Sequence, residues 1–267
     1  MFRFVVCVTL FASGAAISAP IPKGLGPPPI LVVLKPDKHS RIFLCDAEGK
    51  NPKALTEETS NASYPAWSPD GTKIAFSSDR TGVMNVYVMD ADGSNVKALT
   101  AGKLASRVPA WSPDGKSLLF CRAARVGQEI CSVPAAGGEV KVIDCGGDGW
   151  DPAWSPDGKK IAFVSFRAGN GYRLYVMDAD GGNVTKLTEN ANPIGLAYPE
   201  WSPDGKNIAF ADLKEGSIHI FTVNPDGKNL KQVTTETAGN STRTGRPTAR
   251  KSSSSIPSRS RSATSPR

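Results

Sequence analysis

The sequence predicts an all-β protein, a β-propeller of four-stranded blades, and three observations lead to this prediction. The motif Pro-x-Trp-Ser-Pro-Asp-Gly occurs four times, with its tryptophans 44, 43 and 47 residues apart. A fixed period in this range indicates a repeat architecture. Each repeat places two turn signals between short β-like segments, and no segment shows a sustained helical period. Radially arranged four-stranded sheets fit this pattern. The repeated tryptophans, which we expect in the core between blades, are Trp67, Trp111, Trp154 and Trp201.

Residues 64–100 show how one repeat is built. Residues 64–68 are aromatic and contain proline, and they predict a brief first strand. Ser-Pro-Asp-Gly then predicts a turn, because Pro presets φ, Asp bonds its own backbone and Gly adopts positive φ. Residues 73–78 and 85–89 predict two further strands, and a short outer strand follows an Asp-Ala-Asp-Gly turn. A parallel β-helix is the structural alternative, but its coils are shorter and do not need two such turns.

The same pattern recurs along most of the chain. Full repeats are predicted at 64–100, 108–144, 151–188 and 198–234, and a partial repeat at 30–57 lacks the tryptophan strand. The string Pro-Ala-Trp-Ser-Pro-Asp-Gly-x-x-Ile-Ala-Phe, followed by Tyr-Val-Met-Asp-Ala-Asp-Gly-x-Asn, resembles the propeller repeat of the TolB family. The resemblance covers residues 30–234. It implies a ring closed by strand exchange, with six blades when complete.

The absence of a closing strand has a predicted consequence. One partial and four full blades without a closing strand leave an apolar blade face and sheet edges uncovered. We therefore expect either poor solubility or closure into a strained five-bladed ring.

The N-terminal residues predict export. Arg3 precedes an apolar run and a series of small residues, so residues 1–19 read as a secretory signal peptide. The run is too short for a transmembrane anchor. Residues 20–29 predict a stiff proline-rich linker. The mature protein is therefore expected in the periplasm or secreted, without membrane insertion.

Residues 235–267 differ in composition from the repeats. One interpretation is a disordered basic tail, since residues 243–267 hold seven Lys or Arg and no acid. The other is a frameshift within a fifth full repeat. Codons compatible with residues 243–254, read one base out of frame, spell Asp-Trp-Ser-Pro-Asp-Gly-Lys-Lys-Ile-Val-Phe, and the next tryptophan is due near residue 244. Residues 243–267 carry the whole formal net charge of +7, so the charge does not predict a nucleic-acid partner.

Catalytic and cofactor sites are not predicted. The chain has two histidines and no nucleophile or metalloprotease motif, so we expect no enzymatic activity and no cofactor. The Asp-Ala-Asp-Gly turns resemble the start of a calcium loop but lack its further ligands, and no metal site is predicted. Each Ser-Pro-Asp-Gly aspartate is expected to cap its turn. These aspartates are Asp70, Asp114, Asp157 and Asp204.

Cysteine positions leave two alternatives open. Cys121 and Cys131 fall on adjacent predicted strands and could face each other. An oxidising compartment would allow a disulfide between them, whereas buried free thiols are the other interpretation.

One face of the propeller is predicted to bind a partner. Because strands alternate in direction, the two kinds of aspartate turn share one side, and the longer, varied loops lie on the other. Variable loops on a rigid scaffold are where binding usually occurs. Four cations fall on these loops and could receive an acidic or C-terminal segment; ordinary solvated charge is the alternative. They are Arg80, Arg125, Arg167 and Lys214.

The sequence thus predicts an exported TolB-like propeller that acts as a protein-binding scaffold, with a role in cell-envelope integrity implied by the resemblance. The alternative is a propeller related to hydrolase or peptidase accessory domains, or one that binds a small ligand or sugar.

Overall fold

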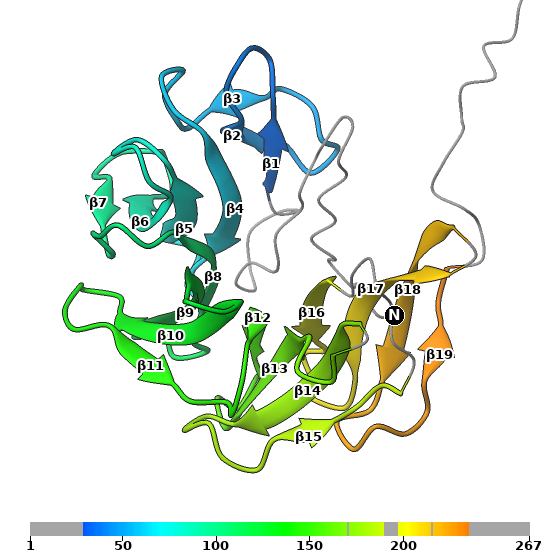
Figure 1. Ribbon diagram of the computed structural model, residues 1–267. Coiled ribbons are helices and arrows are strands. Elements are labelled where there is room, and N and C mark those ends of the chain that lie inside the picture. Colours follow the sequence, from blue (N-terminus) through cyan, green and yellow to red (C-terminus); the bar gives the residue numbers. More distant parts are fainter. Residues whose placement is uncertain (1–28, 170, 190–196, 215, 235–267) are drawn as a thin grey trace, which may run out of the picture.

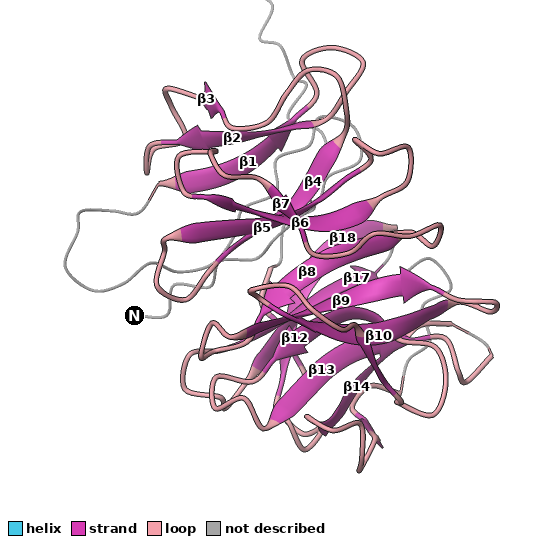
Figure 2. Ribbon diagram, turned by 90° about the vertical axis from the view of Figure 1, so that its left-hand side faces the viewer, coloured by secondary structure: helices cyan, strands magenta, loops and turns pink. Residues whose placement is uncertain are grey.

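The computed structural model describes residues 29–169, 171–189, 197–214 and 216–234, and within these ranges every regular element is a strand. Figure 2 shows this all-β composition. Among the described residues, no helix of a length and hydropathy that could cross a membrane is found. The predicted signal peptide, the tail and all of the linker except Pro29 lie outside the described residues.

Five antiparallel sheets follow one another along the chain around a common centre (Figure 1). The first blade has three strands and each of the other four blades has four, which confirms the prediction of one partial and four full blades. The first blade comprises β1 (Ile30–Leu34), β2 (Arg41–Cys45) and β3 (Lys53–Ala54). The second comprises β4 (Ala62–Trp67), β5 (Lys73–Ser78), β6 (Asn85–Asp90) and β7 (Lys97–Ala98). The third comprises β8 (Ser106–Trp111), β9 (Ser117–Ala123), β10 (Gln128–Pro134) and β11 (Lys141–Ile143). The fourth comprises β12 (Trp150–Trp154), β13 (Lys160–Ser165), β14 (Arg173–Asp178) and β15 (Thr185–Lys186). The fifth comprises β16 (Ala197–Trp201), β17 (Ile208–Lys214), β18 (Ser217–Val223) and β19 (Lys231–Gln232).

In the full blades the tryptophan-containing strand lies nearest the centre, at one edge of its sheet (Figure 1). The first blade has no described strand in this position, and β1 forms the edge of its sheet. The partial repeat seen in the sequence is therefore a blade without its inner strand.

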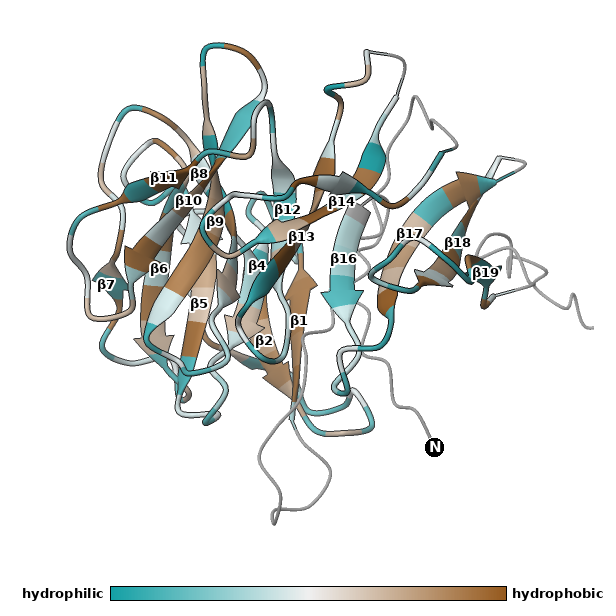
Figure 3. Cartoon of the chain, turned by 90° about the horizontal axis from the view of Figure 1, so that it is seen from below, coloured by the Kyte–Doolittle hydropathy of each residue, from teal (hydrophilic) through white to brown (hydrophobic). Residues whose placement is uncertain are grey.

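The core lies between the blades. The two middle strands of the second, third and fourth blades carry apolar side chains on both faces, and adjacent sheets bury these faces against one another (brown in Figure 3). One phenylalanine of each full blade is almost completely buried in this way, and these residues are Phe76, Phe120, Phe163 and Phe210. Burial on both faces explains why these strands read as continuous apolar runs rather than as alternating patterns.

The repeated tryptophans also lie between blades. Each packs against the cluster that its blade shares with a neighbour. The indole N–H of Trp111 donates to the carbonyl oxygen of Ala66 at 3.1 Å, and that of Trp201 donates to Ala153 at 3.2 Å. Each bond ties a blade to the inner strand of the blade before it.

Every inner strand contains the same irregularity. The pairing register shifts at one residue that has a positive φ and precedes a proline. A positive φ is costly for non-glycine residues and costliest for a β-branched one. The four residues are Tyr64, Val108, Asp151 and Tyr198. Their recurrence shows that the bulge is built into the repeat and is not an accident of one blade.

The strand register decides between the two alternatives for the cysteines. Cys121 pairs with Ile130, and Cys131 pairs with Phe120. Residues one register step apart point to opposite faces of a sheet. The expectation that Cys121 and Cys131 face each other is therefore wrong, and both are buried free thiols. Burial raises the pKa of the Cys131 thiol to about 11.

Candidate functional site

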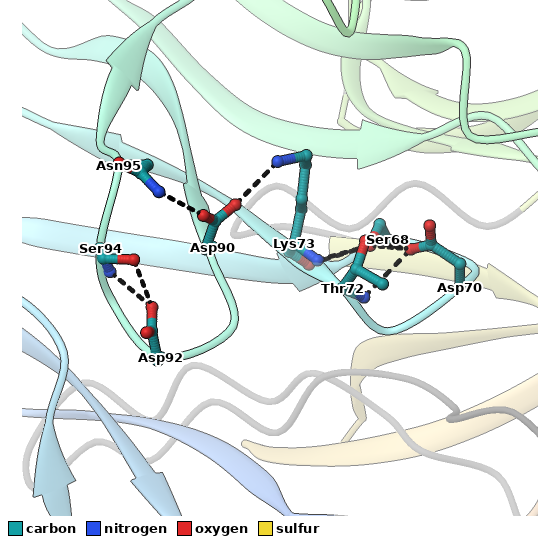
Figure 4. Close-up of polar contacts among 8 residues, drawn as sticks. All are labelled: Ser68, Asp70, Thr72, Lys73, Asp90, Asp92, Ser94 and Asn95. Atoms are coloured by element: carbon teal, nitrogen blue, oxygen red, sulfur yellow. Dashed lines mark hydrogen bonds and ion pairs between the residues drawn. The ribbon is translucent and has the colours of Figure 1, made fainter.

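The two sides of the propeller differ in how many of their charged side chains are hydrogen-bonded within the protein. On the first-turn side, the Ser68 hydroxyl donates to Asp70 at 2.6 Å, and the amide of Lys73 donates to the same hydroxyl at 2.9 Å (Figure 4). The backbone amide of Thr72 also donates to Asp70, at 3.0 Å. These donors, the serine hydroxyl first, hold the pKa of Asp70 below its usual value.

The same serine–aspartate bond recurs in the other full blades at 2.6–2.7 Å. The bonded pairs are Ser112 with Asp114, Ser155 with Asp157, and Ser202 with Asp204. The pKa of each of these aspartates is lowered, with the serine hydroxyl as the largest cause. The aspartates thus act within their own turns.

The first aspartate of the Asp-Ala-Asp-Gly turn also accepts hydrogen bonds from side chains of its own blade. In the second blade, Asp90 accepts from the side chains of Asn95 at 2.6 Å and Lys73 at 2.7 Å (Figure 4). Asp178 of the fourth blade accepts equivalent bonds. Among the described residues, no group of three or more His, Cys, Asp or Glu is placed to hold a metal ion. The aspartates of these turns therefore already have hydrogen-bond partners within their own blades.

On the opposite side, two of the four predicted cations lie flat on aromatic rings of their own blade. The Arg80 guanidinium sits 4.9 Å from the centroid of Tyr87 and 5.5 Å from that of Phe76. These two rings are themselves stacked at 5.6 Å. The Nε of Arg80 also donates weakly to Ser78 Oγ, at 3.4 Å.

Arg167 repeats this arrangement in the fourth blade with stronger hydrogen bonds. Its guanidinium lies 4.8 Å from Tyr175 and 5.1 Å from Phe163. Its Nε donates to Ser165 Oγ at 2.8 Å, and its Nη1 donates to the carbonyl oxygen of Cys145 at 2.6 Å. Arg167 therefore fastens the connection between the third and fourth blades as well as presenting charge at the surface.

The other two predicted cations are exposed and have few internal contacts. Lys214 ends β17 and donates to Gln232 at 2.9 Å. Arg125 lies in the β9–β10 loop beside Val126, which is 83% exposed. In the third blade, Arg122 instead forms the ion pair of that hairpin, with its Nε 2.6 Å from Glu129. Arg80 and Arg167 are therefore held by contacts within their own blades, whereas the exposed side chains of Arg125 and Lys214 can contact a partner.

An aromatic cluster on the same side was not predicted from the sequence. Trp150 and Phe166 both contact the ring of Tyr172, with centroids 6.1 and 5.3 Å away. Asp148 organises the cluster: it accepts from the Trp150 indole at 2.9 Å and from the Ser165 hydroxyl at 2.7 Å. Phe166 is 41% exposed, so the cluster reaches the surface.

Two acids in the inner strands were also missed. Asp151 occupies the bulge position that holds Tyr or Val in the other full blades, and Glu200 occupies a position that holds Ala. Burial raises the pKa of Asp151 to about 6 and that of Glu200 to about 7. Aligning the repeats would have shown both as acids replacing other residue types.

Asp151 has an identifiable structural role. In the second and third blades, a side chain of the second strand accepts the next bulge amide: Ser77 accepts from Val108, and Cys121 from Asp151. The fourth blade has Val164 at this position, which cannot accept. The Tyr198 amide instead donates to the Asp151 carboxylate, at 3.4 Å. Asp151 thus replaces the missing acceptor.

Comparison with known proteins identifies the repeat. The family model of the TolB beta propeller domain matches residues 26–149 and 138–255. The chain belongs to this TolB propeller family. No curated protein matches the sequence.

Solved TolB structures share the fold. A putative TolB from Agrobacterium tumefaciens is 24% identical with a TM-score of 0.68, and the match covers 76% of each chain. TolB from Acinetobacter baumannii is 26% identical with a TM-score of 0.67, over 78% of this chain and 52% of that one. The chain therefore spans about half the length of the A. baumannii protein.

An enzyme also shares the propeller architecture. An oligogalacturonate lyase from Vibrio parahaemolyticus is 18% identical with a TM-score of 0.54, over 77% of this chain and 61% of the lyase. Similarity at this level shows the fold alone. The match to the TolB family supports the prediction that this chain is not an enzyme.

Proposed function

We propose that this TolB-family propeller is an exported, non-enzymatic scaffold that binds a protein or peptide partner and contributes to cell-envelope integrity. The observation that carries the proposal is the family match, which extends over all of the described propeller. The signal-peptide pattern of residues 1–19 supports export to the periplasm or beyond the cell.

The loop side is the proposed binding face. It carries the four cations and the Trp150–Phe166–Tyr172 cluster, whereas the turn side consists of short turns in which Asp70, Asp90 and their counterparts are bonded internally. Arg125 and Lys214 supply exposed positive charge, and Arg80 and Arg167 present guanidinium groups held in fixed positions. This surface fits an acidic segment or a C-terminal carboxylate, because the exposed cations Arg125 and Lys214 can pair with carboxylates. Arg167 adds positive charge nearby, although its Nε, Nη1 and Nη2 already donate within the protein.

Charge reversal on the two sides tests the proposal. The probe is a synthetic glutamate-rich peptide with a free C-terminal carboxylate, and the measurement is its affinity for the purified chain by titration calorimetry. Arg125→Glu combined with Lys214→Glu should weaken binding by about tenfold or more, because both side chains contact solvent and approach the proposed partner.

A matched control separates the site from general electrostatics. Lys116→Glu combined with Lys206→Glu makes the same change in net charge at exposed positions on the turn side. Affinity should stay within about twofold in this variant. Equal weakening by the two double variants, or no binding of the peptide to the wild-type chain, would refute the proposed face.

A further inference from the structure

The loop-side corner of the fourth blade departs from the repeat at three positions, and each departure places an aromatic residue there. These residues are Trp150, Phe166 and Tyr172. The strand register aligns each of them with a non-aromatic residue in every other full blade. The aligned residues are Ser63, Asp79 and Met84 in the second blade, Arg107, Ala123 and Gln128 in the third, and Ala197, Leu213 and Ile218 in the fifth. The repeat itself therefore does not require aromatic rings at this corner.

The second blade shows how the same corner is closed without aromatic residues. There, Asp79 accepts hydrogen bonds from the backbone and side-chain amides of Asn61, both at 2.7 Å. In the fourth blade the acid lies on the other segment: Asp148, at the position of Asn61, accepts from the backbone amide of Phe166 at 3.0 Å. This bond does not use the phenyl ring. The ring of Phe166, which is 41% exposed, is thus not needed to close the corner.

A loop of the third blade extends this surface. Gly127 of the β9–β10 loop approaches Asp148 so closely that a Cβ on this glycine would lie 2.8 Å from the Asp148 Cβ. Gly127 also has a φ of 67°, which glycine adopts without strain. The close approach brings the exposed residues Arg125 and Val126 to the same corner. We call the surface formed by Arg125, Val126 and Phe166 the junction patch, because it spans the third and fourth blades.

The apolar part of the junction patch is rigidly supported. Val126 is 83% exposed and Phe166 is 41% exposed. The Phe166 ring meets Tyr172 at 63° with the centroids 5.3 Å apart, and Tyr172 meets Trp150 at 90°. Because the Phe166 ring is held in place by this series, a further ring could pack on it with little loss of side-chain entropy.

The charged part of the junction patch favours an anionic partner. The carboxylate of Asp148 already accepts hydrogen bonds from Trp150 at 2.9 Å and Ser165 at 2.7 Å. The Nε, Nη1 and Nη2 atoms of Arg167 donate within the protein. Arg125 is exposed and can pair with a carboxylate.

We propose that the junction patch binds a peptide segment in which an aromatic side chain is adjacent to a carboxylate. The aromatic ring packs against Phe166 and Val126, and the carboxylate pairs with Arg125. This inference rests on the proposed loop-side function and specifies the chemistry of the partner. A peptide is favoured over a lipid surface, because one phenylalanine and one valine bury little of the apolar area on which attachment to a membrane depends.

Two synthetic peptides of equal length and charge test the proposal. One is glutamate-rich with a single central phenylalanine, and the other has alanine in its place. Their affinities for the purified chain are measured by titration calorimetry. The phenylalanine peptide should bind at least about tenfold more tightly, because it buries a ring in the junction patch. Phe166→Ser should remove this preference and leave the affinity for the alanine peptide within about twofold.

A second variant guards against loss of folding. Phe166→Ser retains the backbone amide that donates to Asp148, so the corner should stay closed. Val126→Ser changes a side chain that is 83% exposed and should not affect folding. This variant should reduce the preference for the phenylalanine peptide by about threefold.

Ile218→Ser provides the matched control, since Ile218 is 46% exposed and lies on the loop side of the fifth blade, near the start of β18. This variant should keep the full preference for the phenylalanine peptide. The proposal is overturned if Phe166→Ser weakens both peptides alike, or if Ile218→Ser removes the preference as Phe166→Ser does.

The two peptides also separate this inference from the proposed function. Equal binding of both peptides to the wild-type chain would overturn the inference and leave the proposed acidic partner intact. Binding of neither peptide would overturn both.

The same variant tests two other occupants of the junction patch. Flotation with vesicles that contain an anionic phospholipid should show no attachment of the wild-type chain, and sedimentation velocity should show no self-association. Attachment or self-association that Phe166→Ser abolishes would assign the patch to lipid or to a second copy, and would overturn the proposal.

Discussion

The fourth and fifth blades are built from nearly the same motif but end in different surroundings. Both have a buried serine in the first turn, and both stack an aromatic pair between their middle strands, at 5.6 Å in the fourth and 5.8 Å in the fifth. The fourth is covered on both faces, whereas the outward face of the fifth exposes Val233. A repeat motif therefore specifies a blade, but the neighbouring blade decides whether an apolar residue becomes core.

The largest difference in stability between these blades should appear when the third-strand side chain that faces away from the preceding blade is truncated. This side chain is Leu174 in the fourth blade and Ile220 in the fifth. Leu174→Ala should lower the free energy of unfolding by about 3 kcal/mol, because it leaves a cavity between two packed sheets. Ile220→Ala should cost about 1 kcal/mol or less, since its surroundings are partly open to water. Urea denaturation followed by tryptophan fluorescence measures both values. Similar losses of unfolding free energy in the two variants would mean that this face of the fifth blade is covered in solution, which would contradict the difference between the two blades.

A second prediction concerns Glu200, which occupies an inner-strand position that holds Ala in the other full blades. Burial raises its pKa to about 7, so the folded protein retains a proton that the unfolded chain loses near pH 4. The free energy of unfolding therefore falls as the pH rises from about 4 to about 7. Glu200→Gln removes this loss. Its stability relative to the wild type should increase between pH 5 and pH 8 by on the order of 2 kcal/mol.

The control for this pH effect is Glu189→Gln, just after the outer strand of the fourth blade. The Lys186 ammonium group lowers the pKa of Glu189, so this carboxyl stays ionised above pH 5 in both states. Its variant should show no change in relative stability between pH 5 and pH 8. A flat profile for Glu200→Gln would show that the inner-strand carboxyl is well hydrated.

The smallest expected difference compares Arg167, two residues after the second strand of the fourth blade, with Lys214, the last residue of the second strand of the fifth. Arg167→Ala should cost about 1–2 kcal/mol, because it removes the stacking on Tyr175 and Phe163 and the bond to the Cys145 carbonyl. Lys214→Ala should cost about 0.5 kcal/mol or less, since the side chain is exposed. Thermal unfolding of both variants measures the difference, and equal shifts in Tm would contradict the internal role of Arg167.

The sequence predicted the blades well because their determinants are local. Pro, Asp and Gly fix each turn within four residues, and the apolar runs between turns have strand length, so the order and approximate bounds of the strands follow directly. The loop-side residues were harder to predict. Arg80 and Arg167 were predicted as cations available to a partner, but each stacks on two aromatic rings that lie four to eight residues away on two neighbouring strands. Which face of the sheet those rings occupy depends on the register, which the sequence does not state. Cys121 and Cys131 required the register itself, because a shift of one residue reverses the face on which a side chain lies.

By itself, the sequence determined that this chain forms TolB-like blades, since turn chemistry and apolar periodicity act over short stretches and recur four times. Only the tertiary structure decided that Asp151 accepts a hydrogen bond from the next blade and that Cys121 and Cys131 point to opposite faces of their sheet. It also decided that Val233 is 49% exposed, whereas the residues at the same position of the other blades are buried, namely Leu55, Leu99, Ile143 and Leu187. The physical reason is that hydrogen bonding and burial at these positions depend on the neighbouring strand or sheet. An identical side chain is core or surface according to what packs against it.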